Sequence, residues 1–427
     1  MTARLHITDV DFAAKLAACL NTRQSEVNDV APVVSEMIAC VRAEGDAALV
    51  EYTQRFDKLT MDAAGLRITE AEMQQAEAAC DAEVRSALEV ATQRIRAYHE
   101  AQRPENKRWV DDSGVTLGWQ YAPLESVGLY VPGGKASYPS SVLMNAVPAK
   151  VAGVDRIVMV VPTPGGVINP AILVAAKLAG VDEIYRVGGA QAVAALAYGT
   201  QTIAPVVKIV GPGNAYVAEA KRQVFGKVGM DTIAGPSEIL VVADAKNEPT
   251  WIAADLLSQA EHDEMAQSIL ITNSQNFADA VANEIEQLLT LLPRADIARH
   301  SWQQHGAIIV VDQWHEALPI IATIAPEHLE LALDEAEELA PKVRNAGAIF
   351  LGRHTPEAMG DYLAGPSHVL PTSGAAKFSS GLSVFDFLNR TSLIGCSGQP
   401  ELVHVAATLA DAEGLPAHAL SLRLRLK

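Results

Sequence analysis

Cysteine is scarce in this chain of 427 residues, which contains four. Cys19, Cys40, Cys80 and Cys396 are spaced neither as a zinc ribbon nor as a disulfide framework. Three of them lie in segments with a helical pattern, where a cysteine usually serves as a small buried apolar residue. The cysteines therefore predict neither a thiolate metal site nor a disulfide-stabilised fold.

Clustered positive charge and long apolar runs are also missing. The formal net charge is -18, and no basic run stands out, which argues against a nucleic-acid partner. No apolar run is long enough to span a bilayer, and Asp9 and Asp11 break the apolar residues near the start, where a signal peptide would have a continuous core. We therefore expect a cytoplasmic protein with no nucleic-acid and no membrane partner.

The length and the hydrophobic content of the chain favour more than one domain. The length exceeds one domain at about 100–200 residues each, and 49% of the residues are hydrophobic. The first hundred residues have a mostly helical pattern, with one helix over 27–44, ended by Gly45, and a long one over 70–101. Thr69 and Glu72 have the spacing of a capping box at the start of the long helix.

From Ser126 onward, short apolar runs rich in β-branched residues alternate with helical patterns. These runs are VGLYVP, RIVMVVP, EIYRVGG and VKIVGPG, and later EILVVAD, SILITN, AIIVVD and AIFLG. The helix after RIVMVVP is well delimited, with Asn169 as its cap, Pro170 at its first position and Gly180 at its end. Strands that alternate with helices predict parallel sheets with helices on both faces.

The stretch LLSQAEHDEMAQ, at 256–267, collects side chains that can hold a metal ion or move a proton. It includes the end of an expected helix, on which Gln259 and His262 are three residues apart and share a face. That spacing suits two ligands of one metal ion. A solvated helix end, at which His262 meets the helix dipole, would explain the same residues.

Three further stretches carry candidate side chains. In IAPEHLEL, Glu327 and His328 could supply two bases, of which His has the pKa suited to deprotonating an alcohol. A polar turn before a strand is the alternative. In PEAMGDYLAGPSHVLPTSG, Asp361 could be an oxygen ligand or a turn residue. In DAEGLPAHALS, Glu413 could hold a cationic amine and His418 a metal, or both could belong to a solvated tail.

Two glycine-rich stretches, VGGAQAVAALAYG and VGPGNAYVAEAK, each follow an expected strand and open a helix. Backbone N–H groups and the helix dipole favour a phosphate group at such a place. The second stretch lacks the third glycine of the dinucleotide-binding motif, and no acidic residue stands at the usual spacing. Either a cofactor phosphate or a tight strand-to-helix turn accounts for the pattern.

Taken together, these stretches resemble the histidinol dehydrogenase family over most of the chain, from about Asp46 to His418. The resemblance is carried by long, ordered motifs: VGLYVPGG, VGGAQAVAALAYGT, GPGNAYVAEAKRQV, AGPSEILVVAD, DLLSQAEHDEMAQS, APEHLEL and GDYLAGPSHVLPT. It implies a zinc-dependent enzyme that oxidises L-histidinol to L-histidine through L-histidinal, in two successive hydride transfers to NAD.

The resemblance also implies roles for individual residues. Glu327 and His328 match the family's general bases, and Tyr130, Gln191 and Asn214 match its contacts to NAD. One zinc ion per subunit would be held by residues matching Gln259, His262, Asp361 and, from the other subunit of a homodimer, His418. The implied substrate contacts are Ser237, Gln259, His262, His328, Asp361, Glu413 and His418. No cysteine lies in these motifs, which favours oxidation of the aldehyde through water over a thiol route.

The fold expected from the pattern and the resemblance is α/β, with two Rossmann-like parallel-sheet domains, one inserted in the other, and a helical N-terminal region. The expected division is an N-terminal arm at 1–26, a first α/β domain at 27–127 plus 240–380, a second Rossmann-like domain at 128–239, and a C-terminal dimer-swapped segment at 381–427. This last segment is too short to form a large core alone, so we expect it to pack on a partner subunit.

Three other functions explain the sequence less well. A related dehydrogenase for another small polar alcohol gives no reason for a tail with Glu413 and His418, which suit the amine of histidinol and the metal. A zinc hydrolase leaves the expected NAD contacts without a role. A non-enzymatic two-domain binding protein gives no reason for the pair Glu327 and His328 beside a set of metal ligands.

Overall fold

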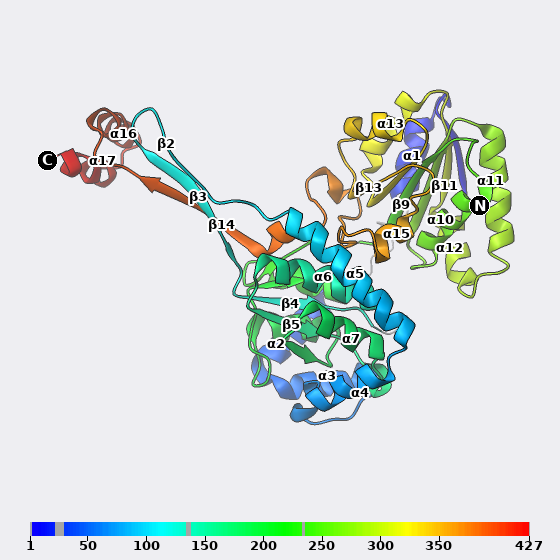
Figure 1. Cartoon of the computed structure of the whole chain (residues 1–427), viewed down its shortest axis with the longest axis horizontal. Helices are drawn as coiled ribbons and strands as arrows, with labels where there is room; N and C mark the ends of the chain where they lie inside the picture. Colours follow the sequence, from blue (N-terminus) through cyan, green and yellow to red (C-terminus); the bar gives the residue numbers. More distant parts are fainter. Residues whose placement is uncertain (1, 22–29, 134–137, 233–234, 427) are drawn as a thin grey trace.

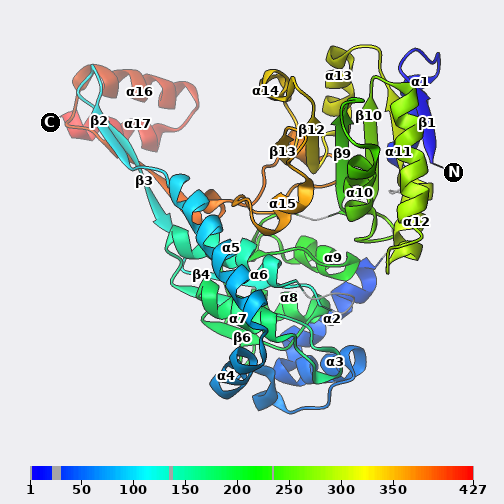
Figure 2. The same ribbon diagram turned by 45° about the vertical axis from the view of Figure 1, so that its right-hand side comes forward.

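The computed structural model describes residues 2–21, 30–133, 138–232 and 235–426. Figures 1 and 2 show three parts: two α/β domains and a long arm that carries the C-terminal helices away from both. All strand pairs of the two large sheets are parallel, as the alternation of strands and helices predicts.

The larger sheet has six strands in the order β1-β11-β10-β9-β12-β13. Alternate residues of its central strands join apolar cores on opposite faces, so both faces are covered by helices. Helices α1 (Phe12–Asn21) and α13 (Trp314–Ile324) cover one face, and α10 (Pro249–Ala260), α11 (Gln275–Leu288) and α12 (Ala295–His305) cover the other. The strands are β1 (Ala3–His6), β9 (Glu238–Ala243), β10 (Gln267–Thr272), β11 (Ala307–Val310), β12 (His328–Ala332) and β13 (Ala348–Leu351).

The second sheet has five strands in the order β6-β5-β4-β7-β8. If these five strands are numbered 1 to 5 along the chain, their order in the sheet is 3-2-1-4-5. A dinucleotide-binding sheet has the same order. The strands are β4 (Ser126–Tyr130), β5 (Arg156–Val160), β6 (Glu183–Tyr185), β7 (Lys208–Val210) and β8 (Gly229–Met230). The helices on one face are α4 (Glu70–Ala79), α5 (Ala82–Ala101), α6 (Pro139–Ala152) and α7 (Pro170–Ala179), and those on the other are α2 (Ala31–Glu44), α3 (Asp46–Asp57), α8 (Gly189–Tyr198) and α9 (Ala215–Val224).

The packing corrects the expected domain division. Helices α2 to α5 pack on the five-stranded sheet, because residues such as Val34, Leu49 and Ile95 join its two apolar cores. The expected grouping of 27–127 with 240–380 in one domain is therefore wrong for these helices. The first residues are not a separate arm either, since β1 pairs with β11 and α1 covers the same six-stranded sheet. The five-stranded domain is therefore inserted between α1 and β9.

A three-stranded antiparallel sheet forms the arm, in the order β14-β3-β2. Its strands are β2 (Lys107–Val110), β3 (Thr116–Pro123) and β14 (Leu388–Gly395), and β14 leads into α16 (Pro400–Ala412) and α17 (Pro416–Arg423). In both views these two helices lie at the far end of the arm, away from both large sheets (Figures 1 and 2). Their own core is small, with three buried alanines.

Local signals in the sequence mostly have the predicted outcome. The capping box of Thr69 and Glu72 is confirmed, and so is the Asn169 cap of α7. The single long helix over 70–101 is wrong, because the chain breaks at Cys80 and restarts at Asp81, whose carboxylate accepts the N–H groups of the next turn. No helix among the described residues combines the length and apolar character needed to cross a membrane.

Candidate active site

Most of the expected site residues gather where the carboxyl end of the five-stranded sheet meets the amino end of the six-stranded sheet. A cleft of about 1620 Å³ is lined by Tyr130 and Asn214 from the first and by Ser237 and His262 from the second. Tyr130 ends β4, whereas Ser237 directly precedes β9. One half of the site thus follows the rule that ligands bind at the carboxyl ends of parallel strands, and the other half does not.

Glu327 and His328 stand at the start of β12. Helix α13 ends at Ala325 in a left-handed conformation with φ of 49°, and Pro326 then leads the chain into the strand. Both side chains are buried. The backbone beside them is crowded, because a Cβ atom on Gly347 would lie 2.5 Å from the carbonyl oxygen of Glu327. Glycine at 347 is therefore required by this close approach.

His328 is held as a neutral base. Its Nδ1 lies 2.9 Å from the carbonyl oxygen of Glu238, which can only accept, so Nδ1 carries the proton. Its Nε2 is then an acceptor; it is buried without a hydrogen-bond partner among the described residues and lies 3.8 Å from Oδ1 of Asp361. Burial lowers the pKa of His328, against the opposing effect of the Asp361 carboxylate. Glu327 accepts the N–H of Glu238 at 2.9 Å, so one residue orients both side chains.

Gln259 and His262 come from the end of α10 and lie against each other. Nε2 of Gln259 is 3.0 Å from Nδ1 of His262. Gln259 is fully buried, and its Oε1 has no hydrogen-bond partner among the described residues. Burial lowers the pKa of His262, while the Asp361 carboxylate acts in the opposite direction. Asp361 therefore lies within electrostatic reach of both His262 and His328.

Helix α15 (Glu357–Tyr362) supplies Asp361 together with Glu357, which the sequence did not single out. The two residues are four apart on one helix face. With His328 they form a group whose ligand atoms all lie within 4.8 Å of one another, and Oε1 of Glu357 is 3.4 Å from Nδ1 of His328. The spacing of Glu357 and Asp361 in PEAMGDY is the sequence signal that points to this residue.

His368 is a second residue that sequence reasoning missed. Its Nδ1 lies 3.0 Å from the carbonyl oxygen of Asp361, and its Nε2 lies 3.2 Å from the hydroxyl of Ser141 on α6. It therefore connects the six-stranded domain to the five-stranded domain beside the site. No periodic spacing distinguishes His368 from a loop residue in GPSHVLPT.

Buried carboxyl groups, including those of Glu330 and Glu357, lie near His328. Glu330 is two residues further along β12, on the same face of the strand, and accepts the N–H of Glu357 at 2.6 Å. Burial and the neighbouring Asp255 carboxylate raise the pKa of Glu330 well above its usual range. Burial raises the pKa of Asp255 to about 6, and it raises that of Glu357 strongly. These groups therefore keep protons at a pH at which exposed carboxyl groups have lost them.

The expected NAD contacts lie together at the carboxyl end of the five-stranded sheet. The Tyr130 hydroxyl accepts the N–H of Gly189, and burial raises the pKa of Tyr130 to about 12. Gln191, in the first turn of α8, is buried, and its Oε1 has no hydrogen-bond partner in the part of the chain that the structure describes. Asn214 caps α9, with Oδ1 accepting the N–H groups of Tyr216 and Val217 at 3.1 Å each.

Glu413 and His418 are not brought to this site by their own chain. Glu413 ends α16 and His418 lies in α17, and both side chains are exposed. Both views place these helices at the far end of the arm (Figures 1 and 2). Two of the expected site residues thus stand apart from the other nine.

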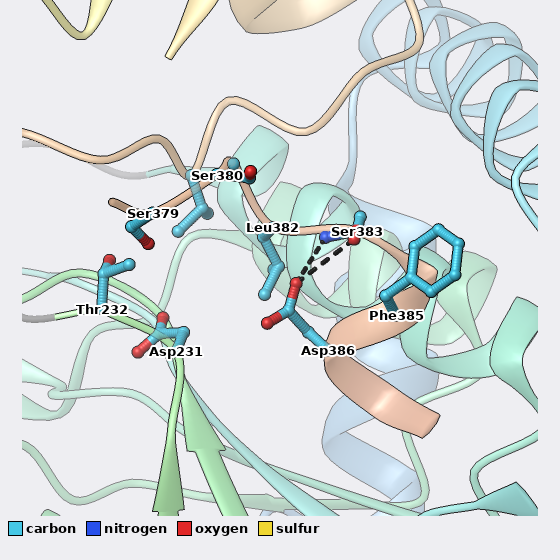
Figure 3. Close-up of a pocket in the computed structure, with 10 residues that line it drawn as sticks. Asp231, Thr232, Ser379, Ser380, Leu382, Ser383, Phe385 and Asp386 are labelled. Carbon is cyan, nitrogen blue, oxygen red and sulfur yellow. Dashed lines mark hydrogen bonds between the residues drawn. The ribbon is translucent and has the colours of Figure 1, made fainter. Parts of the chain in front are cut away.

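A smaller pocket, of about 410 Å³, lies elsewhere, between β8 and the loop before β14 (Figure 3). None of the expected site residues lines it. Its two carboxylates already have cationic partners, since Asp231 pairs with Lys221 and Asp386 accepts from Lys208 at 3.1 Å. Asp386 also accepts from the backbone N–H of Ser383 at 2.9 Å (Figure 3). The pocket therefore offers no carboxylate for a metal ion.

The donors at the main site fit a divalent metal ion. Oε1 of Gln259, Nε2 of His328 and both carboxylate oxygens of Glu357 are buried without hydrogen-bond partners among the described residues. Such acceptors are costly to bury unless a cation or donor meets them, and zinc accepts mixed imidazole and oxygen ligands. The compact group of His328, Glu357 and Asp361 shares only Asp361 with the ligand set implied by the resemblance.

Comparison with known proteins identifies the family. The family model described as histidinol dehydrogenase matches residues 20–426. The chain is 57% identical to histidinol dehydrogenase of Mesorhizobium japonicum over 430 residues, which covers 100% of both chains. It is 59% identical to that of Rhodospirillum rubrum over 429 residues, which covers 100% of this chain and 99% of the relative.

Comparison of the fold with a crystal structure indicates the same family. The crystal structure of histidinol dehydrogenase from Elizabethkingia anophelis matches with a TM-score of 0.95 and 34% sequence identity, over 100% of this chain and 98% of that chain. The two-domain architecture and the arm are thus shared with a solved relative. This chain belongs to the histidinol dehydrogenase family and is an oxidoreductase.

Proposed function

We propose that this protein is a zinc- and NAD-dependent histidinol dehydrogenase, which oxidises L-histidinol to L-histidine through L-histidinal in the last steps of histidine biosynthesis. The supporting observation is the cleft. On one side Glu238 lines the cleft, and its backbone holds a buried imidazole and a carboxylate, those of His328 and Glu327, beside metal-capable donors. On the other side Tyr130 and Asn214 line the carboxyl end of a dinucleotide-binding sheet.

In the first half-reaction, His328 acts as the general base. Its Nε2 takes the hydroxyl proton of L-histidinol while the carbinol carbon gives a hydride to the nicotinamide ring of NAD. The products are L-histidinal, reduced NAD and a protonated imidazole. The lowered pKa of His328 favours return of that proton to solvent at neutral pH. The hydrogen bond from Nδ1 to Glu238 keeps Nε2 as the basic nitrogen throughout.

In the second half-reaction, Glu327 activates water. Its carboxylate removes a proton as the water oxygen bonds to the aldehyde carbon, which gives the hydrate of L-histidinal. Deprotonation of that hydrate then accompanies a second hydride transfer, to a second NAD, and leaves the carboxylate of L-histidine. Glu327 is anchored for this role by the N–H of Glu238, so its orientation does not depend on the substrate.

The zinc ion, when bound, supplies a template for the substrate's imidazole and amine. Gln259, His262 and Asp361 of this chain and His418 of the partner subunit would hold it. Gln259 is fully buried, and its Oε1 has no hydrogen-bond partner within the described ranges, which supports this assignment. Ser237, which lines the cleft as His262 does, would contact the substrate.

The enzyme would work as a homodimer in the cytoplasm, with each site built from two chains. Glu413 ends α16 and His418 lies in α17, and these helices lie at the far end of the arm, away from both large sheets (Figure 1). Helix α16 exposes Leu402, Val405 and Leu409, an apolar face that a second subunit would cover. A symmetric dimer lets both arms exchange at once.

The direct test is the formation of reduced NAD from L-histidinol by purified protein, with and without a zinc chelator. We expect two molecules of reduced NAD for each L-histidinol, and loss of activity on exhaustive chelation with recovery on added zinc. No reduced NAD from L-histidinol, under conditions in which the protein is folded, dimeric and loaded with zinc, would refute the proposed function. Full activity after chelation would refute the role of zinc alone.

A further inference from the structure

The five-stranded domain lacks the acidic residue that dinucleotide-binding sheets usually carry. In the standard arrangement, an Asp or Glu near the carboxyl end of the second strand binds the ribose 2′-hydroxyl of NAD. The second strand here is β5, next to the first strand β4 in the sheet. No Asp or Glu occurs in the chain between Asp155 and Asp182, so neither β5 nor the loop after it supplies this carboxylate.

A carboxylate from another element occupies that place. Asp57 is the last residue of α3, and its Oδ2 accepts the backbone N–H of Thr163 at 3.2 Å. Thr163 lies three residues beyond the end of β5. Helix α3 packs on the same domain through Leu49 and Tyr52, so Asp57 reaches the end of the second strand from a segment that precedes the sheet by about 70 residues in the chain.

Asp57 also lies close to the expected cofactor contacts. Its charge acts on Tyr130, the last residue of β4, whose hydroxyl accepts the N–H of Gly189. The loop after β5 touches the loop after β6, since a Cβ atom on Gly188 would lie 2.5 Å from the Cβ of Pro162. Asp57 thus lies at the loop after β5, which touches the loop after β6, and its charge acts on the end of β4.

The Asp57 carboxylate has capacity left for a ligand. It is half-buried, and no Lys, Arg or His in the described part of the chain pairs with it. Burial raises the pKa of Asp57, with only the Thr163 N–H acting against it. One oxygen is fixed by the backbone, and the other remains an acceptor for hydroxyl groups.

We infer that Asp57 accepts the ribose hydroxyls of the adenosine half of NAD and excludes the 2′-phosphate of NADP. The inference rests on the proposed function, because it requires NAD at the carboxyl end of the five-stranded sheet. A carboxylate accepts hydrogen bonds from vicinal hydroxyl groups, whereas a phosphate at the same position brings like charges together. Asp57 is thus a specificity-determining residue supplied by α3 rather than by the sheet.

The test compares binding of NAD and of NADP by calorimetry in the zinc-loaded protein and its variants. Asp57→Asn removes the charge but keeps an acceptor for Thr163, and Asp57→Ser also makes room for a phosphate. We expect weaker NAD binding and a ratio of NADP to NAD affinity that rises by about tenfold or more, as loss of a charged hydrogen-bond partner implies. The ratio of kcat/KM for the two cofactors should move in the same direction.

Asp62→Asn is the matched control. Asp62 is exposed and also caps a backbone N–H, that of Gly65 at 3.0 Å, so its variant should leave the ratio unchanged. If Asp57 only caps Thr163, its variants will weaken NAD and NADP equally, and the inference is overturned while the proposed function stands. If the unmodified protein binds neither cofactor and reduces neither, the proposed function fails and this inference fails with it.

Discussion

Lys221 and Asp231 form a buried ion pair that hydrogen-bonds to both the carbonyl oxygen and the N–H of Gly211. Nζ of Lys221 donates to the carbonyl oxygen of Gly211 at 3.0 Å, and Oδ2 of Asp231 accepts its N–H at 2.7 Å. Gly211 has φ of 107°, and a Cβ atom there would lie 2.2 Å from the carbonyl oxygen of Tyr130. The pair therefore fixes the loop that leads from β7 to Asn214.

Lys221→Met should weaken NAD binding and destabilise the fold. The variant leaves Asp231 as a lone buried charge, which costs about 3–5 kcal/mol, and it frees the loop before Asn214. We expect the KM for NAD to rise about tenfold or more, with the KM for L-histidinol little changed. Urea unfolding and steady-state kinetics measure the two effects.

Two further variants separate positioning from stability. The double variant Lys221→Met with Asp231→Leu has no lone charge, so it should recover part of the lost stability while NAD binding stays weak. Lys227→Met, an exposed lysine in the same segment, should change neither quantity. Normal NAD binding in the double variant would show that the pair does not position the loop.

Glu327→Gln should slow oxidation of L-histidinal more than oxidation of L-histidinol. Only the second half-reaction needs an activated water, and loss of one general base typically costs about 10²–10⁴ in rate. Single-turnover measurements that start from the alcohol and from the aldehyde separate the two steps. Equal, small losses in both steps would remove Glu327 from this role.

His262→Asn should remove bound zinc. His262 lies against the buried Gln259 and within electrostatic reach of Asp361, and the side-chain amide is a poor replacement for an imidazole ligand. Elemental analysis of dialysed protein should find one zinc per chain in the unmodified protein and almost none in the variant. Glu264→Gln, an exposed residue of the same stretch, is the control and should retain zinc. Equal zinc contents in both variants would contradict the assignment.

Glu330→Gln should reduce the loss of stability at alkaline pH. The folded pKa of Glu330 lies well above its ordinary value of 4.5, and that of Asp255 rises to about 6. Between the ordinary and the folded pKa, the unfolded chain binds fewer protons than the folded chain. This contribution to the free energy of unfolding is therefore fully present below the ordinary values, and it is lost as pH rises through the folded pKa values.

Urea unfolding at about pH 5 and about pH 8 measures this difference. The unmodified protein should lose on the order of 1–3 kcal/mol more than Glu330→Gln between the two conditions. The glutamine keeps an acceptor for the Glu357 N–H and removes the repulsion with Asp255. Glu335→Gln, which is exposed, should keep the pH dependence of the unmodified protein. Identical slopes for all three proteins would show that the carboxyl pair does not titrate as described.

A mixture of two inactive variants tests the shared site. One chain carries Glu327→Gln with His328→Ala, and the other carries His418→Ala. If the arms exchange, a mixed dimer contains one site with all residues intact, so activity should return after subunit exchange, up to about half of that of an unmodified dimer. Native mass spectrometry confirms that exchange has occurred. Exchange without any return of activity would mean that His418 serves its own chain.

Local patterns predicted most of the two large sheets, because each element carries its own signals. The helix α7 is an example, with Asn169 at its start and a left-handed Gly180 at its end. The arm was missed, because β2 and β14 are mostly exposed and lack an alternation of buried and exposed residues. The grouping of α2 to α5 was wrong, since the periodicity of a helix defines its apolar face and not the sheet that the face meets.

The candidate site shows the same limit. Gln259 and His262 are close in the chain and share a helix face, so their contact follows from spacing. Glu330 and Glu357 were missed, because a buried carboxyl group and a solvated one look alike in a sequence. The contact of Asp57 with Thr163 joins residues 106 positions apart, which no local pattern encodes.

The insertion of one domain into the other has a consequence for synthesis of the chain. Ala3 of β1 pairs with Ala307 of β11, so the first strand leaves the ribosome about 300 residues before its partner. At about 5–20 residues per second, it waits roughly 15–60 s. The strands β4 to β8 are all complete in that interval, and their helices with them. The five-stranded domain can therefore fold while β1 is still unpaired. The six-stranded sheet is completed only when β11 has been made and β1, the first strand synthesised, pairs with it.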